Sequence, residues 1–361
     1  MPKTGFTVTF TTTDSAVKEI TTDGAATILD AAANQNVVLP SLCGQGACGT
    51  CVATITSGDY VQGPISPDAM GPMAGEGAVL LCRTTAKSDC TIDLPYDNNR
   101  IIDAAPAQRQ ARITALDRVA DGVVRISAEL VPDDVHGSAA EFDAGQFMQV
   151  DVPGTSAKRA YSMANVSNWD GQLEFYVHLI AGGKFSTWLD EQAKVDDVVT
   201  LRGPQGAFGL RENGLRPRWF VGGGTGLAQL LAMLRRMAEW GDPQPARLFV
   251  GVTTPQQLFG TEQVAELEGQ LLEFGVTTCI WKPEGGELPA DLAAGGPGLG
   301  EVRIGNPAEA LADALEGLQD SEEVPDVYVC GPPKMVAAIE QVLAENGVAP
   351  SHVLVERIVE N

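Results

Sequence analysis

The chain has 361 residues, of which 44% are hydrophobic, and it carries a formal net charge of −23. This length exceeds that of an ordinary domain with a single hydrophobic core, so two or three domains are expected. The acidic charge argues against nucleic acid and anionic membranes as partners, since both would repel it. Two explanations of the charge remain open: a solvated acidic surface, or docking to a basic surface of a partner protein.

Residues 1–98 predict a small domain of strands with one helix. The helix-like stretch is "TILDAAANQN" at 27–36, and the strand-like runs lie at 6–12, 16–22, 51–58, 79–84 and 90–96. The polar, proline-bearing segment that follows, 97–110, is typical of a linker.

The same region holds the most distinctive motif of the chain, "CGQGACGTC" at 43–51. Cys43, Cys48 and Cys51 follow a C-x4-C-x2-C pattern, and Cys82 lies further along, which is the spacing of a plant-type [2Fe–2S] site. The interleaved glycines permit the unusual backbone that points N–H groups at cluster sulfurs. Zinc is the alternative, although structural zinc sites favour paired C-x2-C knuckles. Cys90 and Cys279 lie in apolar strands and are expected to be buried small hydrophobes.

Alternating patterns from residue 111 to about 210, separated by turn signals, predict an antiparallel barrel interrupted by one helix at 185–193. "RAYSMAN" (159–165) lies in this barrel, and "GGKFST" (182–187) follows one strand later. An arginine beside a Tyr-Ser pair could hold a phosphate and meet a planar heterocycle, and a helix N-terminus offers N–H groups to a second phosphate. Ordinary barrel packing is the alternative reading of both motifs.

From residue 217 onward, apolar strands alternate with amphipathic helices, which predicts a parallel sheet covered on both faces. "GGGTG" (222–226) joins a strand to a helix, where glycines let a pyrophosphate approach the backbone. "CGPP" (330–333) ends a later strand, at the edge where such sheets bind ligands. Helices are expected at 227–240, 261–274 and 334–346, and a surface loop is expected at about 283–306.

With these motifs, the chain resembles ferredoxin–NAD(P)H reductase fusions over nearly its whole length. It is most similar to the reductase components of soluble diiron monooxygenases of the methane, propane and alkene type, a group favoured by "LLCR" around Cys82 and "DLPY" after it. The resemblance implies a multidomain fold: an α+β, β-grasp-like [2Fe–2S] ferredoxin at 1–98, an antiparallel β-barrel for FAD at 99–213, and an α/β parallel-sheet NAD domain at 214–361.

The resemblance also implies roles for individual residues. In that family an R-x-Y-S motif binds FAD, which implies Arg159 at the phosphate and Tyr161 and Ser162 at the isoalloxazine. Ser162, Cys330 and Glu356 are the implied catalytic residues. Further cofactor contacts are implied at Gly183 and Ser186 for the FAD pyrophosphate, and at Gly223, Gly224, Thr225, Gly226, Cys330, Gly331 and Pro332 for the nicotinamide dinucleotide.

One position departs from the family pattern. Relatives often carry an aromatic residue two positions after the C-terminal Glu, where it covers the flavin face. Here Glu356 is followed by Ile358, so a different shielding of the flavin is expected.

The implied function is electron transfer from NADH through FAD and the cluster to the hydroxylase component of a monooxygenase. NADH gives two electrons together and the acceptor takes them singly, so a flavin must stand between them. NADH is expected over NADPH, because the turn "TTPQQ" (253–257) has no arginine for a 2′-phosphate. The alternatives are the reductase of an aromatic ring-hydroxylating dioxygenase and a non-enzymatic redox carrier or sensor.

The chain contains neither an apolar run of roughly 18 residues nor an N-terminal signal pattern. We therefore expect no membrane association and a cytoplasmic location. We also expect a monomer. Stable disulfides are rare in the cytoplasm, so the seven cysteines call for another explanation.

Overall fold

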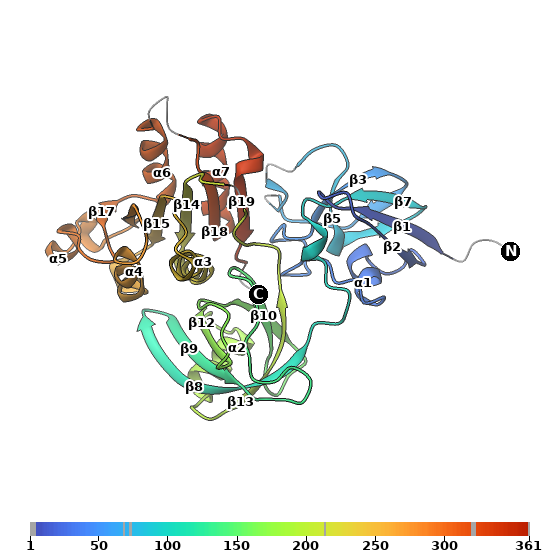
Figure 1. Cartoon of the computed structure of the whole chain (residues 1–361), viewed down its shortest axis with the longest axis horizontal. Coiled ribbons are helices and arrows are strands. Elements are labelled where there is room, and N and C mark those ends of the chain that lie inside the picture. The colour runs from blue at the N-terminus through green and yellow to red at the C-terminus, as the bar shows by residue number, and fades with distance from the viewer. Residues whose placement is uncertain (1–4, 68, 72–73, 213, 319–322, 360–361) are drawn as a thin grey trace. The chain divides into compact units, whose positions relative to one another are not determined.

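The computed structural model describes residues 5–67, 69–71, 74–212, 214–318 and 323–359 (Figure 1). The described chain forms two compact units. The first contains the residues up to Ala107 together with Gln205–Ala207, and the second contains Gln108–Pro204 and the chain from Phe208 onward. The domain boundaries at 98/99 and 213/214 remain predictions, and residue 213 lies outside the described part.

The first unit is built on a mixed five-stranded sheet in the order β2-β1-β7-β3-β5. The first and last strands of the fold, β1 and β7, run parallel, while the other pairs are antiparallel. The helix α1 (Ile28–Ala33) buries Ile28, Ala31 and Ala32, and the Thr27 hydroxyl caps its N-terminus by accepting from the Asp30 N–H. The strands are β1 (Phe6–Thr11), β2 (Val17–Thr22), β3 (Val52–Ser57), β5 (Ala78–Leu80) and β7 (Cys90–Asp93).

Two details of this unit differ from the sequence prediction. The strand expected at 79–84 ends at Leu80, and Leu81–Arg83 form a short 3₁₀ turn, η2, that carries Cys82. The turn is closed by the Thr84 hydroxyl, which donates to the Leu80 carbonyl at 2.8 Å. A separate two-stranded antiparallel sheet, β4 (Tyr60–Gln62) with β6 (Thr84–Ala86), was not predicted because each strand has only three residues.

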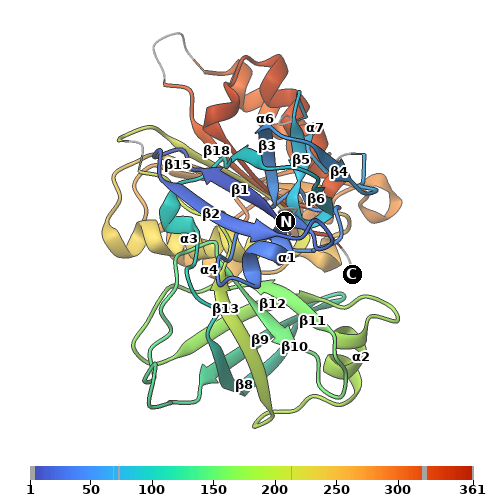
Figure 2. The same cartoon turned by 90° about the vertical axis from the view of Figure 1, so that its right-hand side faces the viewer.

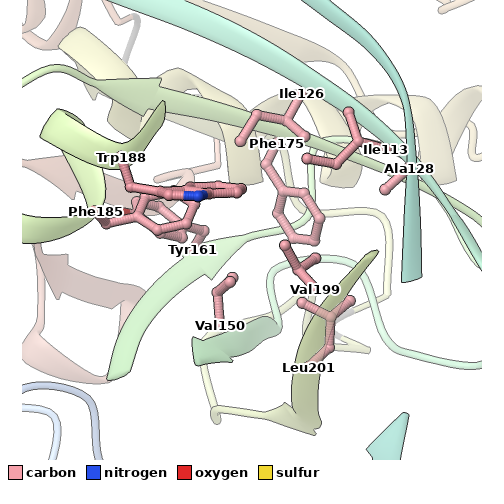
Figure 3. A pocket seen from close by; sticks show the side chains of 10 residues that line it. All are labelled: Ile113, Ile126, Ala128, Val150, Tyr161, Phe175, Phe185, Trp188, Val199 and Leu201. Carbon is pink, nitrogen blue, oxygen red and sulfur yellow. The ribbon is translucent and has the colours of Figure 1, made fainter. Parts of the chain in front are cut away.

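The second unit begins with a six-stranded antiparallel barrel in the order β11-β10-β13-β8-β9-β12 (Figure 2). Apolar side chains fill its interior, as Figure 3 shows, and leave a cavity of only about 10 Å³, roughly the space of one water molecule. The barrel interior is therefore core. The elements are β8 (Gln108–Ala120), β9 (Val123–Leu130), β10 (Phe147–Asp151), β11 (Lys158–Ser162), β12 (Gln172–His178), α2 (Lys184–Glu191) and β13 (Val198–Gln205).

The rest of the second unit is a six-stranded parallel sheet in the order β17-β16-β15-β14-β18-β19. The chain starts at the central strand β14 and adds strands first on one side and then on the other. This reversal marks the switch point where sheets of this kind bind ligands. The strands are β14 (Arg218–Gly223), β15 (Ala246–Val252), β16 (Phe274–Ile280), β17 (Glu301–Ile304), β18 (Asp326–Gly331) and β19 (Val353–Arg357).

The helices of this sheet differ from prediction in three places, the first being α6 (Pro307–Glu316), which was not predicted. The helix expected at 261–274 ends at Glu268, because the chain turns at Gly269 and Phe274 already begins β16. The segment 283–306, expected to be a loop, contains a short helix and the edge strand β17, which pairs with β16. The helices are α3 (Leu227–Trp240), α4 (Thr261–Glu268), α5 (Ala290–Ala293), α6 (Pro307–Glu316) and α7 (Pro333–Glu345).

The predicted fold class is confirmed: a mixed α+β sheet domain, an antiparallel barrel and a parallel α/β domain follow one another along the chain. In the described ranges, every helix is too short or too polar to cross a bilayer.

Candidate functional site

The cysteine loop, residues 43–51, connects the end of the α1 region to β3. Gly44, Gly46 and Gly49 all have a positive φ, at 64°, 78° and 81°, a conformation that a side chain disfavours. These turns point backbone N–H groups inward, and that of Gln45 donates to the Cys43 sulfur at 3.4 Å. The loop therefore presents amide hydrogens to sulfur, as an anionic cluster requires.

The four thiols of the predicted cluster meet as two pairs, Cys43 with Cys48 and Cys51 with Cys82. The hydrogen bond to Cys48, helped by backbone N–H groups, lowers the pKa of Cys43 to about 5. The hydrogen bond to Cys51 lowers the pKa of Cys82, and the pKa of the other thiol in each pair is raised. In the described chain, no three His, Cys, Asp or Glu side chains gather closely enough for a single metal ion.

This arrangement fits a [2Fe–2S] cluster better than zinc. A two-iron cluster needs two thiolates for each iron rather than four around one point, and the structure offers two adjacent pairs. Cys48, Cys51 and Cys82 are buried and Cys43 is half-buried, so the site is sheltered on most sides. Cys90 and Cys279 lie apart in strands β7 and β16 and are buried.

The strand β11 carries the R-x-Y-S motif and pairs with β10. Tyr161 is opposite Met148, whose side chain belongs to the barrel core, and its ring lies 5.0 Å from that of Phe185. Burial raises its pKa. Because side chains alternate along a strand, Arg159 shares the face of Tyr161, while Ser162 faces the opposite way.

The helix α2 follows Gly183, and its N-terminus has no side-chain cap. Its first-turn N–H groups are thus left for another acceptor. Ser186 is buried, and its hydroxyl oxygen accepts from the Ile180 N–H at 2.9 Å. This bond fixes the turn that leads into the helix.

The glycine loop between β14 and α3 packs against the end of β18. A Cβ at Gly226 would lie 2.4 Å from the Cys330 carbonyl oxygen, and one at Gly223 would lie 2.4 Å from the Met335 sulfur. Only glycine fits at Gly226, where the close atom is backbone, whereas a side chain at Gly223 would have to displace Met335. Gly224 has a φ of 52° and open space beside it, and no side chain caps α3. A phosphate could therefore reach the N-terminus of α3. Around this loop Thr225 is half-buried, Gly331 is buried and Pro332 is exposed.

Ser162, Cys330 and Glu356 come together around one residue that the sequence analysis missed, Gln229. Cys330 and Glu356 are register partners on β18 and β19. The Ser162 hydroxyl donates to the Gln229 side-chain oxygen at 2.7 Å, and the Gln229 amide nitrogen donates to the Cys330 sulfur. The Glu356 carboxyl lies beside the same side chain, which opposes the rise in its pKa. The signal that could have identified it is a glutamine among the apolar residues of α3.

Burial governs the chemistry of this centre. Glu356 is 3% exposed, and desolvation raises its pKa to about 7, against the opposing effect of the Gln229 hydrogen bond. Burial, and then the neighbouring Glu356, raise the pKa of Cys330. The thiol is therefore a neutral group rather than a thiolate nucleophile. Ile358 is half-buried, and its N–H donates to the Gly331 carbonyl at 2.9 Å.

Comparison with known protein families agrees with this organisation. Residues 12–87 match the 2Fe-2S iron-sulfur cluster binding domain, residues 134–209 match the oxidoreductase FAD-binding domain, and residues 220–341 match the oxidoreductase NAD-binding domain. The three predicted cofactors, a [2Fe–2S] cluster, FAD and NADH, are thereby supported.

Three curated relatives cover most of the chain. The reductase component of propane 2-monooxygenase from Rhodococcus jostii (strain RHA1) is 32% identical over 91% of this chain and 86% of its own. Methane monooxygenase component C from Methylosinus trichosporium is 40% identical over 67% and 72%. The electron transfer component of toluate 1,2-dioxygenase from Pseudomonas putida is 32% identical over 95% and 96%. The chain therefore belongs to the iron–sulfur flavoprotein reductases that serve as reductase components of multicomponent oxygenases.

Proposed function

We propose that this protein is the NADH-dependent reductase component of a soluble diiron monooxygenase. The observation that carries the proposal is the centre formed by Ser162, Cys330 and Glu356, which joins the barrel to the parallel sheet in a chain that also holds the cysteine loop. The propane and methane monooxygenase relatives support the choice of partner. When bound, FAD would supply both two-electron and one-electron chemistry, and the cluster held by the four cysteines would supply one-electron chemistry.

The residues of the chain bind and align these groups. We assign the four thiols Cys43, Cys48, Cys51 and Cys82 to the irons. Ser162 and Cys330 border the place where flavin and nicotinamide meet, and Glu356 holds a proton behind them. The remaining cofactor contacts are assigned to Arg159, Tyr161, Gly183 and Ser186 for FAD, and to Gly223, Gly224, Thr225, Gly226, Gly331 and Pro332 for NADH.

The partner could instead be the oxygenase of an aromatic dioxygenase, since the toluate dioxygenase component is similarly related. Reconstitution with a diiron hydroxylase and with a Rieske oxygenase would separate the two readings. A redox carrier without enzymatic activity would show no NADH-driven reduction of an artificial acceptor. We further propose a monomer in the cytoplasm that docks on a basic face of its hydroxylase, as a net charge of −23 favours.

We predict that NADH is preferred over NADPH. The turn after β15 is held by internal hydrogen bonds, because the Thr253 and Thr254 N–H groups donate to the Gln257 side chain at 3.1 and 3.3 Å. The 3₁₀ turn η5 (Pro255–Gln257) in this segment contains no basic residue. Arg247 lies at the opposite end of β15. The nearby Lys282 has its ammonium over the Trp281 ring, 4.1 Å from the centroid.

A 2′-phosphate at this turn would lack the charge-assisted contact that a guanidinium gives, worth about 1.5–3 kcal/mol. We therefore expect kcat/KM for ferricyanide reduction to be roughly ten- to a hundredfold higher with NADH. Lys282→Ala should leave the NADH value unchanged. Equal or better kcat/KM with NADPH would show that the ribose site lies elsewhere or that Lys282 reaches it.

A further inference from the structure

Gln229 is a fully buried polar side chain in an otherwise apolar position. It lies in the first turn of α3, and every other buried residue of that helix is apolar. Its exposed fraction is 0%. A buried amide without partners is strongly unfavourable, so its presence there requires specific hydrogen bonds.

The amide of Gln229 lies among three polar side chains. The side-chain oxygen accepts from the Ser162 hydroxyl at 2.7 Å, and the amide nitrogen donates to the Cys330 sulfur. The Glu356 carboxyl lies beside the same amide, which opposes the rise in its pKa. An amide has two N–H donors. The nitrogen therefore faces Cys330 and the oxygen faces Ser162. One residue thus links β11, β18 and β19.

The helix that carries Gln229 is itself fixed against the barrel. Two turns further along α3, the Arg235 guanidinium donates to the Ala164 carbonyl at 2.7 Å and to the Glu174 carboxylate at 3.2 Å. Tyr176 of β12 packs against Phe259 with ring centroids 4.8 Å apart. The Arg235 bonds tie α3 to the barrel that carries Ser162.

We propose that Gln229 is the positioning residue of this redox centre, whose amide holds the Ser162 hydroxyl, the Cys330 thiol and the Glu356 carboxyl in fixed relation to one another. The inference rests on the proposed function, because it assumes that flavin and nicotinamide meet beside these groups. Gln229 acts through them, and not on the cofactors. Its removal should therefore slow hydride transfer without weakening NADH binding.

The test compares the wild-type holoprotein with Gln229→Met, which keeps the volume and removes the donors and acceptor. We expect the rate constant of flavin reduction by NADH to fall roughly ten- to a hundredfold, with the Kd for NADH unchanged. The infrared S–H stretching band of Cys330, assigned with Cys330→Ala, should shift, while the bands of Cys90 and Cys279 stay in place. Gln244→Met is the matched control, since Gln244 is also buried and bonds only the Gly214 carbonyl in the described chain.

An unchanged Cys330 band together with a reduction rate within about twofold of wild type would overturn the proposal. So would a lower melting temperature with normal reduction, which is what a purely structural role predicts. If Gln229→Met does not fold, Gln229→Asn keeps the amide but shortens its reach, and the same two changes are expected. A wild-type protein that NADH cannot reduce would end the proposed function, whereas the infrared band would still report on Gln229.

Discussion

Cys82→Ser is expected to lose the [2Fe–2S] cluster while FAD stays bound. Cys82 pairs with Cys51, so the substitution leaves one iron with a single thiolate. Iron and acid-labile sulfide should fall from about two of each per chain to background. NADH-driven reduction of ferricyanide should persist, whereas electron delivery to the hydroxylase should be abolished.

Cys90→Ser is the matched control for this experiment. Cys90 is also buried in the same unit. Its sulfur lies in β7, beside the Ser88 and Asp59 carbonyl oxygens at 3.3 and 3.5 Å, and not in the cysteine loop. This variant should keep its cluster and its coupled activity. Stoichiometric zinc without acid-labile sulfide in the wild-type protein would contradict the assignment.

A chain that starts at Gln108 should retain FAD and NADH-driven ferricyanide reduction but fail to support the hydroxylase. The second compact unit begins at this residue, and it contains Ser162, Gln229, Cys330 and Glu356. The electron pair of NADH can therefore still be taken up. The exit for single electrons is missing, because all four thiols of the cluster lie before the cut.

Adding residues 1–107 as a separate ferredoxin piece provides the control. It should restore hydroxylase activity only slowly, because the covalent link supplies an effective concentration on the order of millimolar that two free pieces lack. Coupled turnover by the truncated chain alone at the rate of the full chain would show that the cluster is dispensable.

The cysteine site and the class of each domain could be predicted because their signals are local. The spacing of Cys43, Cys48 and Cys51 with intervening glycines fixes both the ligands and the loop, and α3 spans the predicted residues 227–240. The glycine loop and the end of β18 were likewise marked by short motifs whose position in a parallel sheet determines where they meet.

Apart from the helix α6, which has a local capping signal at Asn306, the features that were missed depend on long-range contacts. The residue that unites the redox centre, Gln229, lies 67 positions from Ser162 and 101 from Cys330, and nothing in its neighbours announces either partner. The edge strand β17 lies in a segment rich in glycine and proline, and only its pairing with β16 makes it a strand. Tertiary packing outweighs local preference at both places.

The most direct test of the whole account is anaerobic addition of NADH to the full-length holoprotein, followed by electron paramagnetic resonance. We predict that the flavin absorbance bleaches and that a rhombic signal of a reduced [2Fe–2S] cluster appears, which decays when oxidised hydroxylase is added. Bleaching of the flavin with no cluster signal, or a cluster signal that the hydroxylase does not discharge, would contradict the path from NADH through the cluster to the oxygenase.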